Sequence, residues 1–569
     1  MDKKKYGPTL PISEEMHSLK YRGQGETFYE AMTRIANALK DDDAHFYAMR
    51  DILLDMRFLP AGRIQAAIGS PRAVTPYNCF VSGTIKDSMD DIMLKASEAA
   101  QTMRMGGGIG YDFSTLRPRG DLIVSLDSRS SGPVSFMGIY DAVCGTIASA
   151  GHRRGAQMGV LRVDHPDIEE FIRAKQNSDK LTNFNISVGV TDEFMEAVRS
   201  GSSFTLRFNG RDYRKVHAPA LFDEIMRSTW DWAEPGVLFI DRINQMNNLW
   251  YCEDIAATNP CAEQPLPPYG ACLLGSFNLT RYIYSYHGVY CFDFLQFRLD
   301  IPIVVRAMDN VVDQAIYPLP QQEAEAKSKR RMGLGVTGLA NAVEALGYGY
   351  GSPAFISFTT SILNTLRDEA YRASVQLAKE KGAFPLFDRE RYSKGNFIQT
   401  LPRNLRDEIY HHGIRNSHLL SIAPTGTISL SADNISSGIE PVYLHQFERT
   451  IQTFDGPRKE VIQDYGVRTF GIKGKTTEEC GIQDHLNVLI AASHRVDSAV
   501  SKTCNVPSDI CWLDFMGVYF KAWEGGAKGC TTYRPGGRRE GILNATPSSE
   551  ENQGTACYID PETGRKKCE

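Results

Sequence analysis

Apolar residues recur at helical spacing in two stretches of the chain, with polar residues at most of the positions between them. In the first stretch, residues 25–40, they are Phe28, Met32, Ile35 and Leu39. In the second stretch they are Leu363, Leu366, Ala370, Ala373 and Leu377. Spacings of three and four residues place such side chains on one face of a helix. The pattern therefore predicts two packing helices, and Gly382 is placed to end the second one.

Between residues 186 and 331, predicted strands and helices alternate. Repeated β-α units of this kind are typical of an α/β barrel. The run at 58–63 breaks the preceding helical pattern, so we place the entry to the main domain soon after it. The chain then divides into an N-terminal helical region at 1–75, a main α/β domain at 76–543 and a polar tail at 544–569.

The composition is that of a soluble globular enzyme. Of the 569 residues, 42% are hydrophobic and 23% are charged, and both values are ordinary for that class. The formal net charge of -5 argues against a general surface for binding nucleic acid. No long apolar run is present to span a bilayer, and the first residues lack the apolar core of a signal peptide. We therefore expect a cytoplasmic protein with no membrane or direct nucleic-acid partner.

Twelve cysteines are dispersed along the chain. Because no signal peptide precedes them, they indicate a reducing compartment with a few redox-active thiols, and not a disulfide scaffold. The pairs Cys504/Cys511 and Cys557/Cys568 lack the CxxC repeats of a four-ligand zinc site. We therefore predict no metal site.

Candidate chemistry is concentrated in residues 258–279, TNPCAEQPLPPYGACLLGSFNL. Asn259, Cys261 and Glu263 alternate, so an extended segment would present an amide, a thiol and a carboxylate on one face. Pro260 and the prolines that follow disfavour both a sheet ladder and a helix, which predicts a rigid finger or loop. A buried structural thiol is the common alternative for a single cysteine. A carboxylate and an amide are poor neighbours for such a thiol.

This segment resembles the catalytic finger loop of ribonucleotide reductases, and NPCAEQPLPPYGAC is most similar to the adenosylcobalamin-dependent (class II) branch. The resemblance implies a ten-stranded α/β barrel around the finger. It also implies reduction of ribonucleotides to 2′-deoxyribonucleotides by thiyl-radical chemistry, for DNA precursor synthesis. In that chemistry Cys261 carries the radical, Glu263 deprotonates the ribose 3′ hydroxyl and Asn259 orients the ribose. Cys79 and Cys272 supply two electrons and finish as a disulfide.

A second stretch, Ser421 to Ser429, reads as an apolar strand that runs into a loop of glycine and hydroxyl residues. A following helix would direct free N–H groups at an anion, although a plain strand-helix turn is the common alternative. The resemblance implies that this loop binds the substrate phosphates and that Asn78 lies beside the substrate. The loop residues are Pro424, Thr425, Gly426, Thr427, Ile428 and Ser429.

The resemblance also implies an allosteric site for a deoxynucleotide or ATP. Asp87, Ser88 and Arg117 match its first part, and a helix should run from Asp87 to about Met103. A second loop, residues 151–159, contributes Arg153, Arg154 and Gln157. On its local pattern alone, this loop would be interpreted as a basic, solvent-exposed loop. The glycine run at 106–110 does not fit a dinucleotide-binding fingerprint.

The source of the radical is indicated by Thr531 and Thr532. Related reductases that receive their radical from a ferritin-like metal subunit carry an adjacent tyrosine pair at these positions. A threonine hydroxyl is too hard to oxidise for that relay, which favours adenosylcobalamin. Tyr533 keeps open the alternative of a large subunit fed by a ferritin-like partner.

Cys557 and Cys568 match a C-terminal thiol pair that re-reduces the active-site disulfide and is itself served by a thioredoxin or glutaredoxin. Their wide spacing leaves two unrelated surface thiols as the alternative. The short N-terminus leaves no room for a regulatory ATP-binding module, so we expect no overall-activity switch. The resemblance further implies a homodimer. The more distant rival is a nucleotide-binding regulator that has lost catalysis.

Overall fold

The computed structural model describes residues 6–147, 156–176, 180–453, 456–537, 557–559 and 566–568. Its N-terminal part holds the helices α1 (Pro11–Tyr21), α2 (Phe28–Leu39), α3 (Asp43–Leu54) and α4 (Gly62–Ala67). The apolar residues predicted to form one face of α2 are all buried, and Thr27 caps the helix in a capping box with Glu30. The first predicted helix is therefore confirmed.

The largest sheet has eight strands in the order β13-β2-β3-β6-β7-β10-β21-β20. Five neighbouring strands run parallel: β2 (Cys79–Val81), β3 (Gly108–Asp112), β6 (Gln157–Arg162), β7 (Phe184–Val190) and β10 (Gly236–Phe239). At one edge β13 (Ala271–Cys272) pairs antiparallel with β2. At the other edge β21 (Gly529–Tyr533) pairs antiparallel with β10 and parallel with β20 (Thr503–Asn505). The sheet is therefore mixed at its two ends and parallel in its middle.

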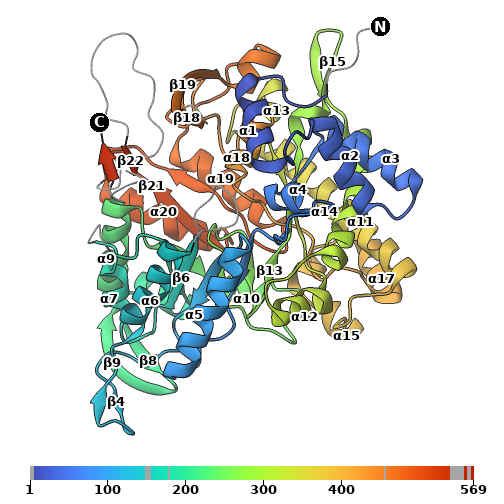
Figure 1. Ribbon diagram of the computed structural model, residues 1–569. Coiled ribbons are helices and arrows are strands. Elements are labelled where there is room, and N and C mark those ends of the chain that lie inside the picture. The colour runs from blue at the N-terminus through green and yellow to red at the C-terminus, as the bar shows by residue number, and fades with distance from the viewer. Residues whose placement is uncertain are drawn as a thin grey trace.

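Helices connect the parallel strands and cover the outside of the sheet (Figure 1). They are α5 (Met89–Arg104), α6 (Pro133–Thr146), α7 (Ile168–Arg173), α8 (Asp192–Arg199) and α9 (Ala218–Trp232). The helix predicted after Asp87 is confirmed as α5, and the Ser88 side chain caps it by accepting from the backbone N–H of Asp91. The inner strands are almost wholly buried, as expected of a parallel sheet covered on both faces.

A second sheet contains β1 (Phe58–Pro60), β14 (Leu274–Asn278) and β17 (Gly333–Thr337), and β14 runs parallel to β17. Two isolated parallel bridges continue from it, one between Leu334 and Leu420 and one between Ile422 and Val500. The two sheets are thus linked through residues 420–422 and through the short step from β13 to β14.

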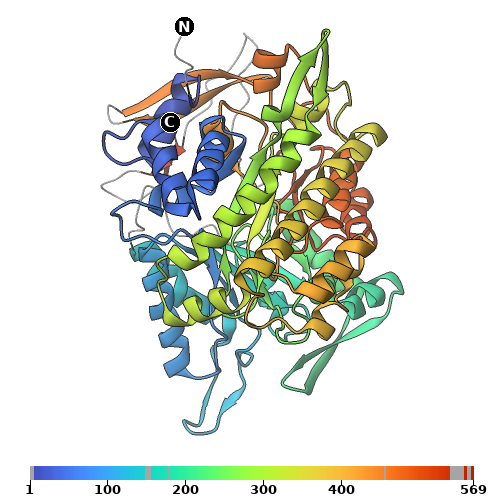
Figure 2. The same ribbon diagram turned by 90° about the vertical axis from the view of Figure 1, so that its right-hand side faces the viewer.

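Two long helices, α11 (Phe294–Gln314) and α14 (Pro353–Lys381), lie side by side outside the second sheet (Figure 2). The five apolar residues that predicted the second packing helix are buried on α14. Gly382 ends this helix with a φ of 85°, a conformation that glycine adopts without steric cost. This prediction is also confirmed.

The alternation predicted for residues 186–331 is interrupted by antiparallel hairpins, among them β8 (Ser203–Phe208) with β9 (Arg211–His217) and β15 (Ile283–Tyr286) with β16 (Val289–Phe292). The remaining hairpins are β4 (Leu122–Ile123) with β5 (Ser128–Arg129), β11 (Ala257–Thr258) with β12 (Pro265–Leu266), β18 (Gln446–Thr453) with β19 (Gly456–Gln463), and β22 (Cys557–Ile559) with β23 (Lys566–Cys568). The remaining helices are α10 (Ile240–Gln245), α12 (Pro320–Lys329), α13 (Leu339–Ala345), α15 (Arg389–Tyr392), α16 (Asn396–Gln399), α17 (Arg403–His412), α18 (Gly426–Ser431), α19 (Ile482–Ser493) and α20 (Trp512–Glu524), with the short turns η1 (Leu279–Tyr282) and η2 (Gly466–Phe470).

The N-terminal helices share their hydrophobic core with the main domain. One buried cluster joins Phe28 and Met32 of α2 to Phe277 of β14 and Val304 of α11. β1 adds a further link because it pairs with β14. Residues 1–75 therefore pack as part of a larger unit in the part of the chain that the structure describes. No helix within these described ranges has the length and apolar character needed to cross a membrane.

Candidate active site

The stretch that carries the candidate chemistry forms a hairpin finger. β11 and β12 pair antiparallel, with Thr258 opposite Pro265. Between them, the Asn259 N–H donates to the Gln264 carbonyl at 3.0 Å and the Ala262 N–H donates to the Asn259 carbonyl at 3.0 Å. Ala262 has a φ of +66°, so the backbone reverses at this point. The predicted finger is confirmed. The extended backbone predicted for Asn259, Cys261 and Glu263 is wrong. A tight turn, and not the alternation of side chains along a strand, brings these residues together.

Glycines on two facing strands make room for the finger. A Cβ atom on Gly110 of β3 would lie 1.8 Å from the Thr258 carbonyl oxygen. A Cβ atom on Gly333 of β17 would lie 2.4 Å from Nε2 of Gln264. Side chains at these positions would overlap the finger, so the close approach of its backbone requires glycine on both sides. The finger therefore lies between the eight-stranded and the three-stranded sheet.

Hydrogen bonds hold the finger tip from both sides. Nδ2 of Asn185, on β7, donates to the Pro260 carbonyl at 3.1 Å. The Glu263 carbonyl accepts from Oγ of Ser421 at 2.8 Å and from the Ala499 N–H at 3.0 Å. These bonds join the tip to segments from distant parts of the chain, so its position depends on the whole domain.

The two predicted reducing cysteines face each other across a strand pair. Cys79 on β2 and Cys272 on β13 are register partners, and directly opposed residues in antiparallel strands have Cβ atoms roughly 4.5–5.5 Å apart. Because disulfides need Cβ separations of about 3.5–4.5 Å, a small movement would suffice to join them. Both are in the thiol form and not joined in a disulfide.

The surroundings of Cys272 show that four candidate groups share one environment. Cys272 is fully buried. Burial raises its pKa well above the ordinary thiol value, and charge on Cys79, Glu263 and Cys261 raises this pKa further. Such interactions fall off with distance, so Cys79, Cys261 and Glu263 all lie within electrostatic range of Cys272. Cys261 is half-buried and Glu263 is 2% exposed.

Buried polar atoms around the finger point to a ligand. Oδ1 of Asn259 accepts from the Gln264 N–H at 2.9 Å, and since a backbone N–H can only donate, this bond fixes the orientation of the amide. Nδ2 of Asn259, both polar side-chain atoms of Gln264 and Oδ1 of Asn78 are buried and have no hydrogen-bond partner among the described residues. Leaving such an atom unsatisfied costs about 1–3 kcal/mol, which a bound polar molecule would offset.

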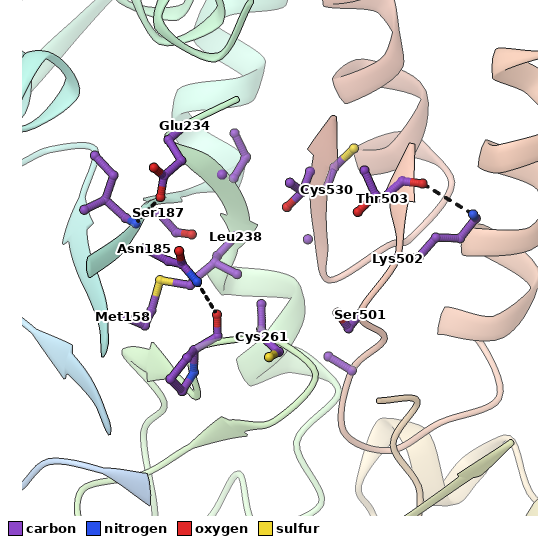
Figure 3. A pocket seen from close by; sticks show the side chains of 18 of the residues that line it. Met158, Asn185, Ser187, Glu234, Leu238, Cys261, Ser501, Lys502, Thr503 and Cys530 are labelled. Atoms are coloured by element: carbon purple, nitrogen blue, oxygen red, sulfur yellow. Dashed lines mark hydrogen bonds between the residues drawn. The ribbon is translucent and has the colours of Figure 1, made fainter. Parts of the chain in front are cut away.

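A cavity of about 240 Å³ borders the finger at Cys261 (Figure 3). Asn185 and Ser187 line it from β7, and Thr503 and Cys530 line it from β20 and β21. Sequence reasoning missed these residues because they are scattered over several strands and form no local motif. The carboxylate of Glu234, at the cavity wall, pairs with Lys175 at 2.7 Å and accepts from the Ile186 N–H at 3.1 Å. A polar ligand bound in this cavity would therefore lie next to the Cys261 thiol.

The predicted phosphate loop begins next to the finger at Ser421. Leu420 and Ile422 make isolated bridges in place of the strand expected there. Thr425 precedes the short helix α18 with a φ of 50°, and its Oγ1 lies 2.9 Å from the hydroxyls of both Thr337 and Ser429. These hydroxyls hold one another and shape the loop. The first N–H groups of a helix have no partner inside it. The N–H groups of Gly426, Thr427 and Ile428 are therefore the backbone donors that this loop would offer to an anion. Pro424 lies directly before the turn.

The predicted effector residues occupy different settings. Arg117 donates to the Asp87 carboxylate at 2.6 Å, beside the Ser88 cap of α5. Gln157 is 1% exposed, and its amide is bonded to the Tyr111 hydroxyl and the Tyr140 carbonyl. In this conformation Gln157 therefore supports the core and does not face a ligand. Arg153 and Arg154 lie outside the described residues.

Near the C-terminus, Thr531 lines the cavity, and Thr532 is buried with its hydroxyl 2.9 Å from that of Tyr519. The backbone register of β22 and β23 places Cys557 opposite Cys568. Across the described ranges, no cluster of three or more histidine, cysteine or acidic residues is arranged to hold a metal ion.

Comparisons with known proteins place this geometry in a family. The family described as ribonucleotide reductase, barrel domain, matches residues 77–533. A vitamin B12-dependent ribonucleoside-diphosphate reductase of Mycobacterium tuberculosis is 36% identical over 87% of this chain and 72% of its own length. A protein of the same name from Thermoplasma acidophilum is 33% identical over 82% of this chain and 62% of its own. A ribonucleoside-diphosphate reductase subunit alpha of Chlamydia muridarum is 26% identical over 73% of this chain and 45% of its own.

Proposed function

The chain belongs to the ribonucleotide reductase family, and on that premise we propose that it converts ribonucleotides to 2′-deoxyribonucleotides with adenosylcobalamin as its cofactor. The names of its relatives favour a ribonucleoside diphosphate as the substrate. The observation that carries the proposal is the finger itself. Its tip places Cys261 on a cavity and in one electrostatic cluster with Glu263 and the opposed pair Cys79 and Cys272.

The finger residues would divide the chemistry between them. Cys261, as a thiyl radical, takes the hydrogen atom from the 3′ carbon of the ribose. Glu263 accepts the proton of the 3′ hydroxyl, and Nδ2 of Asn259 donates to the ribose and orients it. Water then leaves from the 2′ carbon. Cys79 and Cys272 supply two electrons and two protons and end as a disulfide, and the Cys261 thiol returns a hydrogen atom to the 3′ carbon, which regenerates the thiyl radical.

The cavity beside Cys261 suits part of the cofactor. Its volume of about 240 Å³ is below the roughly 300–1,000 Å³ of pockets that enclose a drug-sized ligand. It would therefore hold only part of the cofactor, beside Cys261. Ser187, Thr503 and Thr531 would offer hydroxyls to that part. When bound, adenosylcobalamin supplies the acceptor for the hydrogen atom of the Cys261 thiol.

Thr531 and Thr532 support this radical source over a ferritin-like subunit. Thr532 is buried against Tyr519, and Thr531 faces Thr503 across the strand pair at the cavity. Neither side chain can relay a radical by oxidation, which leaves direct generation beside Cys261 as the simpler route.

The strand order supports a closed ten-stranded barrel around the finger. β2, β3, β6, β7 and β10 form one parallel group. A second group consists of β14, β17, residues 420–422, the segment from Val500 into β20, and β21. The two isolated bridges connect its middle members, and each neighbouring pair in it is again parallel. The two groups meet antiparallel at β2–β13 and at β10–β21. Such a barrel would keep water away from a carbon radical.

Three further sites belong to the proposal. Substrate phosphates would lie at the loop from Pro424 to Ser429, beside Asn78. A deoxynucleotide or ATP effector would bind near Asp87, Ser88 and Arg117, at a homodimer contact. Cys557 and Cys568 would pass electrons from a thioredoxin- or glutaredoxin-type protein to the Cys79/Cys272 disulfide, and their opposed register supports a joint role.

An anaerobic assay with a ribonucleoside diphosphate and a dithiol, run with and without adenosylcobalamin, tests the proposed function. We expect deoxynucleotide only when the cofactor is present. Equal product without the cofactor would refute cobalamin dependence, and no product with it would refute the proposed activity.

The single-residue test compares Cys261→Ser with Cys79→Ser. Removing the radical-bearing thiol should lower deoxynucleotide formation by at least about 10³-fold while nucleotide affinity stays unchanged, because the thiol acts only in the reaction. Cys79→Ser should still exchange hydrogen at the ribose 3′ carbon, measured with a tritiated substrate, without completing reduction. Normal deoxynucleotide yield from Cys261→Ser would contradict the scheme.

A further inference from the structure

Lys528, directly before β21, is buried with its ammonium group among backbone carbonyls. It is 4% exposed. Its Nζ donates to the carbonyl of Val496 at 3.3 Å, to that of Asp497 at 2.7 Å and to that of Ser498. All three N–H donors of the ammonium group are therefore directed at three consecutive carbonyls of one segment.

The same segment is also fixed through the Asp497 carboxylate. This carboxylate accepts from the N–H groups of Leu419 and Leu420 at 2.7 and 2.9 Å and from the Tyr371 hydroxyl at 2.7 Å. Residues 496–498 are thereby held on one side by Lys528 and on the other by the strand segment that leads to Ser421. A buried ammonium group is retained only where such partners replace its lost hydration.

The next residue along the segment contacts the finger. The Ala499 N–H donates to the Glu263 carbonyl at 3.0 Å, and the same carbonyl accepts from Oγ of Ser421. On its other side, the Lys528 carbonyl accepts from the Phe239 N–H of β10 at 3.0 Å. Lys528 therefore links the first group of parallel strands to the segment that holds the finger tip.

We propose that Lys528 is a positioning residue for the finger: its ammonium group orients residues 496–498 so that Ala499 meets the Glu263 carbonyl, and it thereby sets where the Cys261 thiol lies. Lys528 acts through backbone and does not touch the reacting atoms. The inference rests on the proposed function only for its kinetic consequences, because the position of Cys261 is measurable without turnover.

The charge on Lys528 is finely balanced. Burial lowers its pKa to about 8, and the Asp497 carboxylate opposes that shift. The pKa of neighbouring His418 lies well below its ordinary value because of burial and of the positive charges on Arg331 and Lys528, so this ring is neutral. A neutral amine has two N–H donors, so above about pH 8 one of the three carbonyls loses its bond.

The decisive experiment compares Lys528→Ala with Lys329→Ala. Lys329 is a second buried lysine, but its ammonium pairs with Glu253 and Glu325 and not with the finger supports. Cys261 alkylation by iodoacetamide, followed by mass spectrometry of the finger peptide, reports the position of the thiol. We expect Lys528→Ala to change this rate at least about tenfold and to lower kcat by a similar factor with KM nearly unchanged, and Lys329→Ala to leave the alkylation rate as it is.

Added ethylammonium or propylammonium should restore the alkylation rate of Lys528→Ala, because the small cation can take the place of the missing side chain. A purely structural loss of the lysine stem would not respond to these cations. The proposal is overturned if Lys528→Ala keeps the wild-type alkylation rate, if Lys329→Ala reproduces its effect, or if alkylammonium ions restore nothing.

A measurement on the wild-type protein covers the case in which Lys528→Ala fails to fold. Hydrogen exchange at the Ala499 amide, corrected for the intrinsic pH dependence, should lose protection between pH 7 and pH 9.5. Unchanged protection would reject the role of Lys528. Absence of any deoxynucleotide from the wild-type enzyme would instead refute the proposed function and leave the alkylation and exchange measurements valid.

Discussion

At the scale of single residues, the proposed chemistry depends on keeping the two reducing sulfurs protonated. Cys272 is fully buried, and its pKa lies well above the ordinary value because burial disfavours the thiolate. A protonated thiol can release a proton with each electron that the substrate needs, whereas a thiolate would react with stray electrophiles. The surroundings of Cys272 therefore suit a reductant that acts only on a bound substrate.

This difference predicts selective alkylation. At pH 8, iodoacetamide should modify Cys511, which is exposed, at least about 100-fold faster than Cys272, since only the thiolate reacts and only an exposed thiol is reached. Peptide mass spectrometry over time gives both rates. In urea the two rates should converge, and similar rates in the folded protein would contradict the protected setting of Cys272.

The lowered pKa of Lys528 predicts opposite pH trends for stability and activity. Its folded pKa of about 8 lies below the ordinary 10.5, so between these values the unfolded chain binds more protons. The contribution of this group to stability therefore rises as the pH increases through that window. Activity should fall over the same range, because the three-carbonyl contact weakens. Comparing the pH slopes of unfolding free energy for wild type and Lys528→Met isolates the stability part, and equal slopes would argue against the low pKa.

At the scale of elements, the finger is a hairpin whose position depends on glycines in the two strands that it contacts. Gly110 faces the Thr258 carbonyl on one side, and Gly333 faces Gln264 on the other. The prolines after Cys261 stiffen the hairpin, but rigidity alone would not locate it. Its placement follows from the fit between the two sheets and from the bonds at Pro260 and Glu263.

Gly110→Ala tests that fit. The added methyl would lie 1.8 Å from a backbone oxygen, so the finger or β3 must move, at a cost of about 1–3 kcal/mol or more, and turnover should fall by at least about 100-fold. Gly517→Ala is the control, because nothing lies within 4 Å of its Cβ position in α20. It should add up to about 1 kcal/mol of stability. Urea unfolding and product assays measure both, and full activity of Gly110→Ala would disprove the tight fit.

At the scale of the whole molecule, each turnover of the proposed reaction would consume one dithiol inside the domain. At the strand pair β2–β13, Cys272 is fully buried and Cys79 is half-buried, so a protein reductant would need an intermediary to reach Cys272. Cys557 and Cys568 face each other in the backbone register and are proposed for that task. Thiol-disulfide exchange requires direct contact between sulfurs, which a tail can provide and a folded reductant cannot.

The double variant Cys557→Ser/Cys568→Ser separates the two reductions. It should make about one deoxynucleotide per active site and then stop when a thioredoxin-type protein is the reductant, because exchange with the buried disulfide is blocked. A small dithiol that diffuses to the site should sustain turnover. Product counts under both conditions give the result, and unimpaired turnover with the protein reductant would assign the two cysteines to no redox role.

The sequence by itself determined the local features of this protein. Periodic apolar residues specified α2 and α14, Ser88 marked the start of α5, and the prolines near Cys261 specified a finger. Each depends on interactions among residues a few positions apart, which any window of the sequence contains. The family resemblance rested on such windows too, and the comparisons confirmed it.

Only the tertiary structure decided how these parts meet. No short window of the sequence specifies the turn at Ala262 or the burial of Gln157. The same is true of two contacts between distant segments, that of Cys79 with Cys272 across a strand pair and that of Lys528 with residues 496–498. Strand pairing and burial depend on which distant surfaces exclude water together, and one sequence segment does not contain that information. The residue types of the site were therefore readable in advance, while their arrangement around one thiol was set by packing across the whole domain.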